Sequence, residues 1–298
     1  MKGFFSILRF IFRHPLSRGR STDAILHFFK WQIGASLNRN RVIVDWVNNS
    51  KFITQKGETG LTGNLYCGLM EFEDMSFLLH FINSSDEFYD IGANVGAYTI
   101  LASSVRRCKS YAFEPLPETY DRLVDQIKIN RLEELVSTKN FGVGAKSEIL
   151  EFTNSLNCMN KVNLDPSNKN VTKVPVVTLD DTFRPSNKSI VKIDVEGFEK
   201  FVFEGGKDFF KNENVQALIV ELNGSGSEFG VPDSELDAVI RKFGFIAVSY
   251  NPFDRSLQKI DGFNIVGNTI YVKNLITASE RCQSSEKFIV HSAGDISL

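Results

Sequence analysis

The stretch Asp90-Ile91-Gly92-Ala93-Asn94-Val95-Gly96 constrains this chain more than any other part of its sequence. It follows Phe88-Tyr89, which is typical of the end of a buried strand, and it precedes the apolar run from Ala97 to Ala102, which is typical of the first turns of a helix. Gly92 and Gly96 allow the backbone to turn sharply and to approach a ligand closely. The helix N-terminus beyond them offers free N–H groups and the positive end of a dipole. The pattern predicts a ligand site, and Asp90, which would repel a phosphate, favours a ligand that carries an amino group or a sulfonium charge.

Strands and helices alternate from Glu87 onward, which predicts an α/β fold with a doubly wound, mainly parallel, Rossmann-like sheet covered on both faces. A polar segment from Ser155 to Lys173 is expected to be a surface loop. The expected strands are 87–91, 110–113, 136–140, 148–153, 190–193, 215–221, 245–250 and 269–272. The expected helices are 97–105, 118–130, 198–210 and 234–243.

Residues 1–83 are expected to form a separate α+β N-terminal extension that covers the site of a second substrate, ahead of a main domain over 84–273. Helical spacing over 24–37 places apolar residues on one face. These residues are Ile25, Phe28, Phe29, Ile33 and Leu37. Short strands are expected over 42–47 and 51–54, a turn-rich loop over 56–64 and a helix over 71–82. The polar tail, 274–298, is expected to fray.

Composition excludes several classes of protein. The net charge of −2 and the pI near 6.1 give no overall field that would attract nucleic acid, so no nucleic-acid partner is expected. The four cysteines are scattered, which indicates neither a zinc site nor a disulfide framework and favours reduced thiols in a cytoplasmic setting. No apolar run approaches the ~20 residues that span a bilayer.

The first 20 residues combine apolar and basic side chains. Arg9 interrupts the apolar run and no small-residue cleavage site follows, which argues against a signal peptide. Two interpretations remain. A short helix docks its aromatic face on the domain, which is the commoner use of such a face, or it lies on an anionic membrane surface and makes the protein peripheral to that membrane.

Acidic residues follow the predicted strands. Glu114 ends the second strand, where a carboxylate can accept hydrogen bonds from both ribose hydroxyls of an adenine nucleoside, as in NAD and S-adenosylmethionine. Three features favour the methyl donor: the spacing Gly92-x-x-x-Gly96, which lacks the third glycine of the dinucleotide fingerprint, the charge of Asp90, and the acidic cluster Asp194-Val195-Glu196-Gly197. An NAD-dependent oxidoreductase is the alternative. The missing third glycine argues against it, as does the lack of a convincing His or Tyr–Lys pair for hydride transfer.

These motifs together resemble the FkbM-type methyltransferases. The segments that carry the resemblance are Asp90–Tyr98, Ala112–Pro117, Val176–Asp181 and Val191–Glu199, in the same order within about residues 85–225. The resemblance implies a class I fold that uses S-adenosylmethionine, usually for O-methylation, with sugars, glycolipids or polyketides as acceptors. It does not extend to the N-terminal region or the tail, so the choice of acceptor does not carry over.

The resemblance also implies roles for individual residues. Asp90, Gly92 and Gly96 would frame the methionine part of the cofactor, with Asn94 standing where many methyltransferases have Gly. Glu114 would hold the ribose, and the segment Asn140-Phe141-Gly142 would lie near the adenine. Asp194 would lie beside the sulfonium and the acceptor.

A hydroxyl acceptor needs a general base. The four histidines are predicted to lie away from the strand ends, so Asp194 and Glu196 are the best candidates, followed by Glu221. Glu196 fits equally well as a carboxylate that satisfies the N–H groups at the start of the next helix, and Lys192 is assigned no role. No metal ligand is assigned, although Asp194, Glu221 and Asn223 are compatible with Mg²⁺. A non-catalytic cofactor-binding protein at a membrane surface is the third hypothesis.

Overall fold

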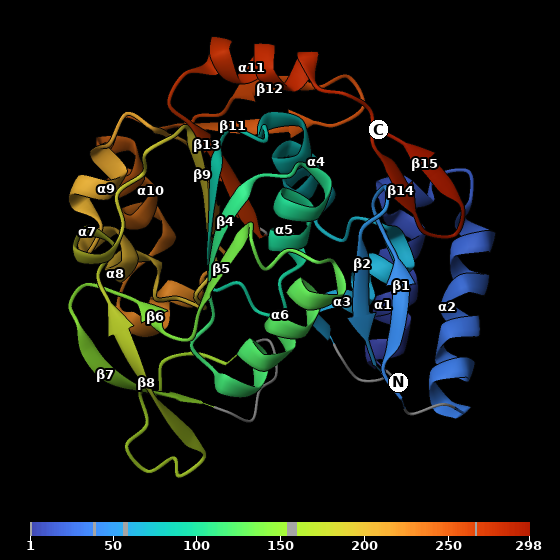
Figure 1. The fold of residues 1–298 in the computed structure, drawn as a ribbon, viewed down its shortest axis with the longest axis horizontal. Helices are drawn as coiled ribbons and strands as arrows, with labels where there is room; N and C mark the ends of the chain where they lie inside the picture. Colours follow the sequence, from blue (N-terminus) through green and yellow to red (C-terminus); the bar gives the residue numbers. More distant parts are fainter. Residues whose placement is uncertain (1, 38–39, 56–58, 154–159, 266) are drawn as a thin grey trace.

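The computed structural model describes residues 2–37, 40–55, 59–153, 160–265 and 267–298, and it contains the expected mainly parallel sheet (Figure 1). In these ranges the sheet has eight strands in the order β12-β11-β13-β10-β9-β3-β4-β5. Five consecutive strands of this sheet are mutually parallel: β10, β9, β3, β4 and β5. Strand β13 runs antiparallel to β10 and to β11. The bounds are β3 Glu87–Ile91, β4 Lys109–Phe113, β5 Val136–Lys139, β9 Ser189–Ile193, β10 Val215–Glu221, β11 Ile246–Asn251, β12 Ser256–Lys259 and β13 Asn268–Val272.

Helices cover both faces of this sheet (Figure 1). Because side chains alternate along a strand, neighbouring residues of β3 and β9 enter opposite cores. Phe88 and Ile190 pack in one core, whereas Tyr89 and Val191 pack in the other. Burial on both faces explains why consecutive residues in the middle of these strands are apolar. The helices of this part are α5 Ala97–Ile100, α6 Pro117–Ile129, α7 Leu179–Thr182, α8 Glu199–Glu204, α9 Lys207–Lys211 and α10 Asp233–Lys242, with a π-helical turn η2 Leu101–Val105 and a 3₁₀ turn η4 Ser225–Phe229.

The single helix expected over 198–210 is wrong, because the chain divides there into α8 and α9. A Cβ on Gly205 would lie 2.0 Å from the carbonyl oxygen of Gly144, so glycine is needed for this close approach of two backbones. The polar loop expected over 155–173 is also wrong at its end. Residues 154–159 lie outside the described ranges, but β8 (Val171–Val177) begins within the expected loop and pairs with β6 (Gly142–Val143) and β7 (Glu148–Thr153) in a separate sheet.

The N-terminal region contains both expected strands but differs from the sequence-based expectation in two places. The expected loop over 56–64 lies partly outside the described residues, and from Thr59 onward it is helix, because Leu61 and Leu65 are buried and their packing outweighs the glycines. The single apolar face expected over 24–37 is wrong, since Phe28 is buried whereas Ile33 and Leu37 are exposed. The elements are α1 Lys2–Arg13, η1 Pro15–Ser17, α2 Ser21–Leu37, β1 Val42–Asp45, β2 Lys51–Thr54, α3 Thr59–Cys67 and α4 Phe72–Phe81.

The C-terminal segment does not fray as expected. It forms α11 (Leu275–Ser284) and the hairpin of β14 (Ile289–His291) and β15 (Asp295–Ser297), which lies beside the N-terminal region (Figure 1). Arg281 of α11 donates a hydrogen bond to the carbonyl of Phe81 at 2.9 Å, and Val290 is fully buried. Tertiary contacts of this kind order a segment whose own sequence is polar. Within the described ranges, the helices lack the length and apolar character needed to cross a membrane.

Candidate active site

The glycine turn joins β3 to α5 at the point where the strand order reverses, because the chain continues from β3 to β4 on one side and returns to β9 on the other. The N–H groups of Gly92 and Ala93 both donate to the carbonyl of Phe113, at 3.0 and 2.8 Å. Gly92 has a φ of +81°, and a Cβ there would lie 1.8 Å from the carbonyl oxygen of Asp194. The turn therefore requires glycine because it packs directly against the end of β9.

Glu114, at the end of β4, holds this turn from the other side. One of its carboxylate oxygens accepts the N–H of Asn94 at 3.0 Å, and the other accepts the N–H of Leu116 at 3.0 Å. Burial raises the pKa of Glu114 to about 7, although the two N–H donors oppose the shift. An ionised carboxylate has about four acceptor positions, so Glu114 retains capacity for further donors after these two bonds.

Asp90 is buried at the end of β3, and its carboxylate accepts a hydrogen bond from the hydroxyl of Thr99 at 2.6 Å. Burial raises the pKa of Asp90, whereas the charge of Lys192 acts in the opposite direction. Asp90 and Lys192 are register partners on neighbouring parallel strands, so their side chains lie on the same face of the sheet.

Lys192, to which the sequence interpretation assigned no role, lines the same cavity as the predicted site residues. It is buried, and its ammonium group lies 2.7 Å from a carboxylate oxygen of Asp194 and 4.8 Å from the ring centre of Tyr98. Burial alone would lower the pKa of Lys192, but the carboxylates of Asp194, Glu71 and Asp90 outweigh burial and raise it. The signal was present in the sequence, because residues two apart in a strand share a face.

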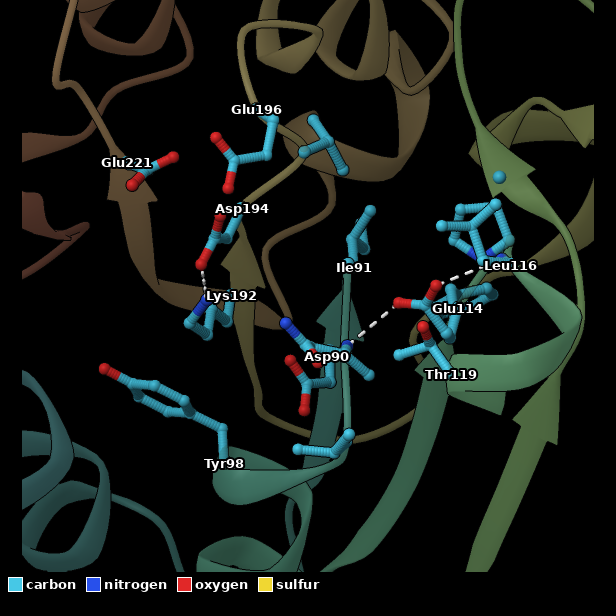
Figure 2. A pocket seen from close by; sticks show the side chains of 18 of the residues that line it. Asp90, Ile91, Tyr98, Glu114, Leu116, Thr119, Lys192, Asp194, Glu196 and Glu221 are labelled. Atoms are coloured by element: carbon cyan, nitrogen blue, oxygen red, sulfur yellow. Dashed lines mark hydrogen bonds and ion pairs between the residues drawn. The ribbon is translucent and has the colours of Figure 1, made fainter. Parts of the chain in front are cut away.

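A carboxylate cluster lies at the ends of β9 and β10. Asp194, Glu196 and Glu221 each place one oxygen within 4.8 Å of the others (Figure 2). Burial, followed by the nearby charge of Asp194, raises the pKa of Glu196 to about 7. Burial and the charges of Asp194 and Glu196 raise the pKa of Glu221 to about 9. Such a set can hold a proton at neutral pH and supplies oxygen ligands of the kind that Mg²⁺ accepts.

The structure removes the helix-capping interpretation of Glu196. The N–H groups of Val195 and Gly197 donate instead to the carboxylate of Glu199, at 3.0 and 3.2 Å. Glu196 has a φ of +54°, in the left-handed region that a non-glycine residue rarely adopts. Its carboxylate makes no hydrogen bond to any residue that the structure describes, so it is free to meet a ligand.

One cavity brings most of the predicted residues together (Figure 2). Its lining includes Asp90, Gly92, Asn94, Glu114, Phe141, Gly142, Asp194, Glu196 and Glu221. Two predicted residues lie outside the lining. Gly96 precedes α5 with a φ of +86°, and Asn140 donates to the carbonyl groups of Glu114 and Pro115 at 2.9 and 3.1 Å. Both therefore shape loops around the cavity.

Residues from outside the predicted motifs complete the cavity. Glu71 and Met75 come from the N-terminal region, and Tyr98 donates a hydrogen bond to the Glu71 carboxylate at 2.6 Å. Of the aromatic residues in the N-terminal region, Trp46 and Phe77 are fully buried in the hydrophobic core and do not line the cavity. The histidines lie elsewhere: His80, for example, is buried against the hydroxyl of Tyr250 at 2.7 Å.

The sheet order and the turn at the end of β3 define a class I, Rossmann-like methyltransferase fold. The family profile described as "Methyltransferase FkbM domain" matches residues 90–247, just over half of the 298 residues. The chain belongs to the FkbM methyltransferase family.

Individual proteins show more distant similarity. Hexuronic acid methyltransferase AglP of Haloferax volcanii is 28% identical over 151 residues, which cover 49% of this chain and 59% of that protein. This chain therefore matches less than two thirds of the relative's length. Methyltransferase FkbM from Methylobacillus flagellatus KT is 13% identical, with a TM-score of 0.44 over 64% of this chain and 44% of that chain. SMU.1697c, a putative methyltransferase from Streptococcus mutans solved in complex with SAH, is 13% identical, with a TM-score of 0.40 over 67% of this chain and 96% of that chain.

Proposed function

We propose that this protein is an S-adenosylmethionine-dependent methyltransferase that methylates a hydroxyl group of a carbohydrate, a glycolipid or another small molecule. The observation that carries the proposal is the charge of the cavity at the switch point. Among the described residues, six carboxylates line it (Glu71, Asp90, Glu114, Asp194, Glu196 and Glu221) against the single ammonium group of Lys192. Even with Glu221 protonated, the acidic groups outnumber this one cation, which favours a cationic ligand and disfavours the pyrophosphate of NAD.

The residues present fit the methyl donor, which supplies an electrophilic methyl group when it is bound. Glu114 has acceptor capacity for ribose hydroxyls, and Phe141 and Gly142 line the neighbouring wall where a base would lie. Asp90 and Asp194 provide negative charge for the amino acid and sulfonium parts. Alignment of donor and acceptor in such a site contributes several kcal/mol to rate acceleration.

Within the carboxylate cluster, we assign the general base to Glu196. Asp194 is already engaged in its ion pair with Lys192, 2.7 Å away. Glu221, with its pKa raised to about 9, retains its proton at neutral pH and can donate a hydrogen bond to the acceptor. Glu196 has a pKa of about 7, near the working pH that favours a general base, and its carboxylate is unpaired within the described structure.

The acceptor class rests on the carboxylate base and on the relative whose printed name is hexuronic acid methyltransferase. A hydroxyl must lose its proton at or near attack, which requires a base of this kind. Mg²⁺ is an alternative means of activating the hydroxyl, because Asp194, Glu196 and Glu221 can offer three oxygens.

The test has two parts. Calorimetry on the purified protein should detect binding of S-adenosylmethionine, and a screen with labelled donor should detect transfer to hydroxylated acceptors, including uronic acids, nucleotide sugars and glycolipids. The screen is run with added Mg²⁺ and with chelator, and loss of transfer with chelator would assign the hydroxyl activation to the metal. Absence of donor binding would refute the proposal, and binding without transfer to any hydroxyl would favour the non-catalytic hypothesis.

A further inference from the structure

Helix α2 is apolar on two opposite faces. Ala24, Phe28 and Ala35 are buried against the protein. Leu26, Phe29, Ile33 and Leu37 follow one another at spacings of three, four and four residues, which places them on a single face. That face is exposed, with Ile33 61% and Leu37 84% accessible. A helix that is apolar on both faces is ordinarily covered on both, yet the described residues cover only one.

Helix α1 extends the same surface. Its Ile11 is fully buried and packs on the domain, but the aromatic side chains of this helix are not docked as one face, since Phe5 and Phe12 remain 66% and 62% exposed. Phe4 connects the two helices, with its ring centre 5.8 Å from that of Phe5 and 6.1 Å from that of Phe29. We call the six exposed residues Phe5, Phe12, Leu26, Phe29, Ile33 and Leu37 the apolar docking face. Exposed apolar groups gathered in this way mark interaction sites.

The charge around this face identifies its partner. Residues 2–37 contain six Lys and Arg residues and one acid, Asp23, whereas the whole chain has a net charge of −2. Arg18 and Lys30 are exposed and form no ion pair with any described residue, whereas Arg9 and Arg13 line a separate pocket together with Glu71, Glu73 and Asp74. Two copies of so basic a surface would repel each other, whereas apolar side chains flanked by Lys and Arg match an anionic bilayer interface.

We propose that the apolar docking face binds the surface of an anionic membrane, with α1 and α2 lying in the interface and their basic residues contacting lipid headgroups. In Figure 1, α2 forms the outer edge of the molecule, on the side away from β7 and β8. The surface is therefore accessible to a bilayer. This inference is independent of the methyl-transfer activity, because it depends only on exposure and charge in the N-terminal region.

The experiment is co-sedimentation of the intact protein with phosphatidylcholine vesicles, with and without phosphatidylglycerol, at low and high salt. We expect binding to the anionic vesicles, weakening with salt. The double variant Ile33→Asn, Leu37→Asn should lower partitioning by about ten-fold or more, because both side chains lose apolar burial in the bilayer. Arg18→Gln with Lys30→Gln should lower anionic-vesicle binding by about five-fold per charge.

Matched controls are Ile276→Asn, at a residue that is 72% exposed on α11, and the pair Lys242→Gln, Lys259→Gln. These variants should partition like the wild type. The proposal would be overturned if the wild-type protein remained in the supernatant with anionic vesicles. It would also be overturned if the control variants lost as much vesicle binding as the docking-face variants. The Ile33→Asn, Leu37→Asn variant is also studied by analytical ultracentrifugation. If its vesicle binding is unchanged but an oligomer dissociates, the face is a subunit interface and not a membrane-binding surface.

Discussion

Replacing Glu114 by Gln tests the donor site through one buried group. The two carboxylate oxygens accept the N–H groups of Asn94 and Leu116, each at 3.0 Å. An amide of the same size offers one oxygen and one NH₂ group, so one of these two N–H donors would face another donor. The variant therefore disturbs the glycine turn as well as removing the negative charge that would meet the ribose.

The expected loss follows from these two effects. A buried N–H that loses its partner costs about 1–3 kcal/mol, and a hydrogen bond to a charged acceptor exceeds one to a neutral acceptor by about 1 kcal/mol. The unpaired N–H is present with and without donor, so its cost lowers the free energy of unfolding, whereas the weaker acceptor lowers donor affinity by about 1 kcal/mol, or about five-fold. The pKa of Glu114 near 7 adds a pH signature, because only the ionised group accepts at both oxygens. Wild-type affinity should fall by up to about five-fold from about pH 8 to about pH 6.

Isothermal titration calorimetry with S-adenosylmethionine measures the loss of affinity and its pH dependence. The matched control is Glu118→Gln, an exposed carboxylate in the first turn of α6, which should bind the donor like the wild type. In Glu114→Gln the part of the pH dependence that belongs to Glu114 should disappear. Affinity within about two-fold of the wild type, or an unchanged pH profile, would show that Glu114 does not hold the donor.

Three further substitutions address the other parts of the site. Glu196→Gln should lower kcat by about 10²–10⁴-fold with a much smaller loss of donor affinity, and near-normal turnover would exclude it as the base. Lys192→Met removes the buried cation beside Asp194 and should lower the free energy of unfolding by ~3–5 kcal/mol in denaturant titrations at neutral pH. The loss should be smaller at low pH, where the carboxyl groups are protonated. Equal losses at both pH values would contradict this reasoning. Gly92→Ala should lower Tm far more than Gly224→Ala, because both have positive φ but only Gly92 lacks room for a Cβ; equal losses would indicate backbone strain alone.

The position of the candidate site could be predicted because its residues follow the ends of parallel strands. Asp90, Glu114, Asp194 and Glu221 each lie at the carboxyl end of a strand or directly after it. Parallel strands bring their carboxyl ends to one edge of the sheet, so an alternation of strands and helices is enough to place these residues together. Lys192 escaped this reasoning because it lies inside a strand, where a charged residue would ordinarily be excluded from the core.

Elements that depend on tertiary contacts could not be predicted from local pattern. The sequence of α3 contains two glycines, and α11 is polar, so neither has strong helical character of its own. Burial of Leu61 stabilises α3. Burial of Cys282 and the hydrogen bond from Arg281 to the carbonyl of Phe81 stabilise α11. The contribution of Glu71 to the cavity was hidden for the same reason, because it comes from a segment that precedes the motifs and reaches the site only through packing of α4.

The charges in the cavity couple donor binding to activation of the base. A cation placed beside Asp194 and Glu196 favours their ionised forms, so it should lower the pKa of Glu196 from about 7. A donor that carries a sulfonium charge would then displace the proton from Glu196 as it binds, and the carboxylate would be ready to accept the proton of the hydroxyl. Calorimetry in buffers of different ionisation enthalpy should detect proton release near neutral pH, which Glu196→Gln should reduce. SAH lacks the methyl group and its positive charge, so it should release fewer protons, and equal release by both ligands would contradict this coupling.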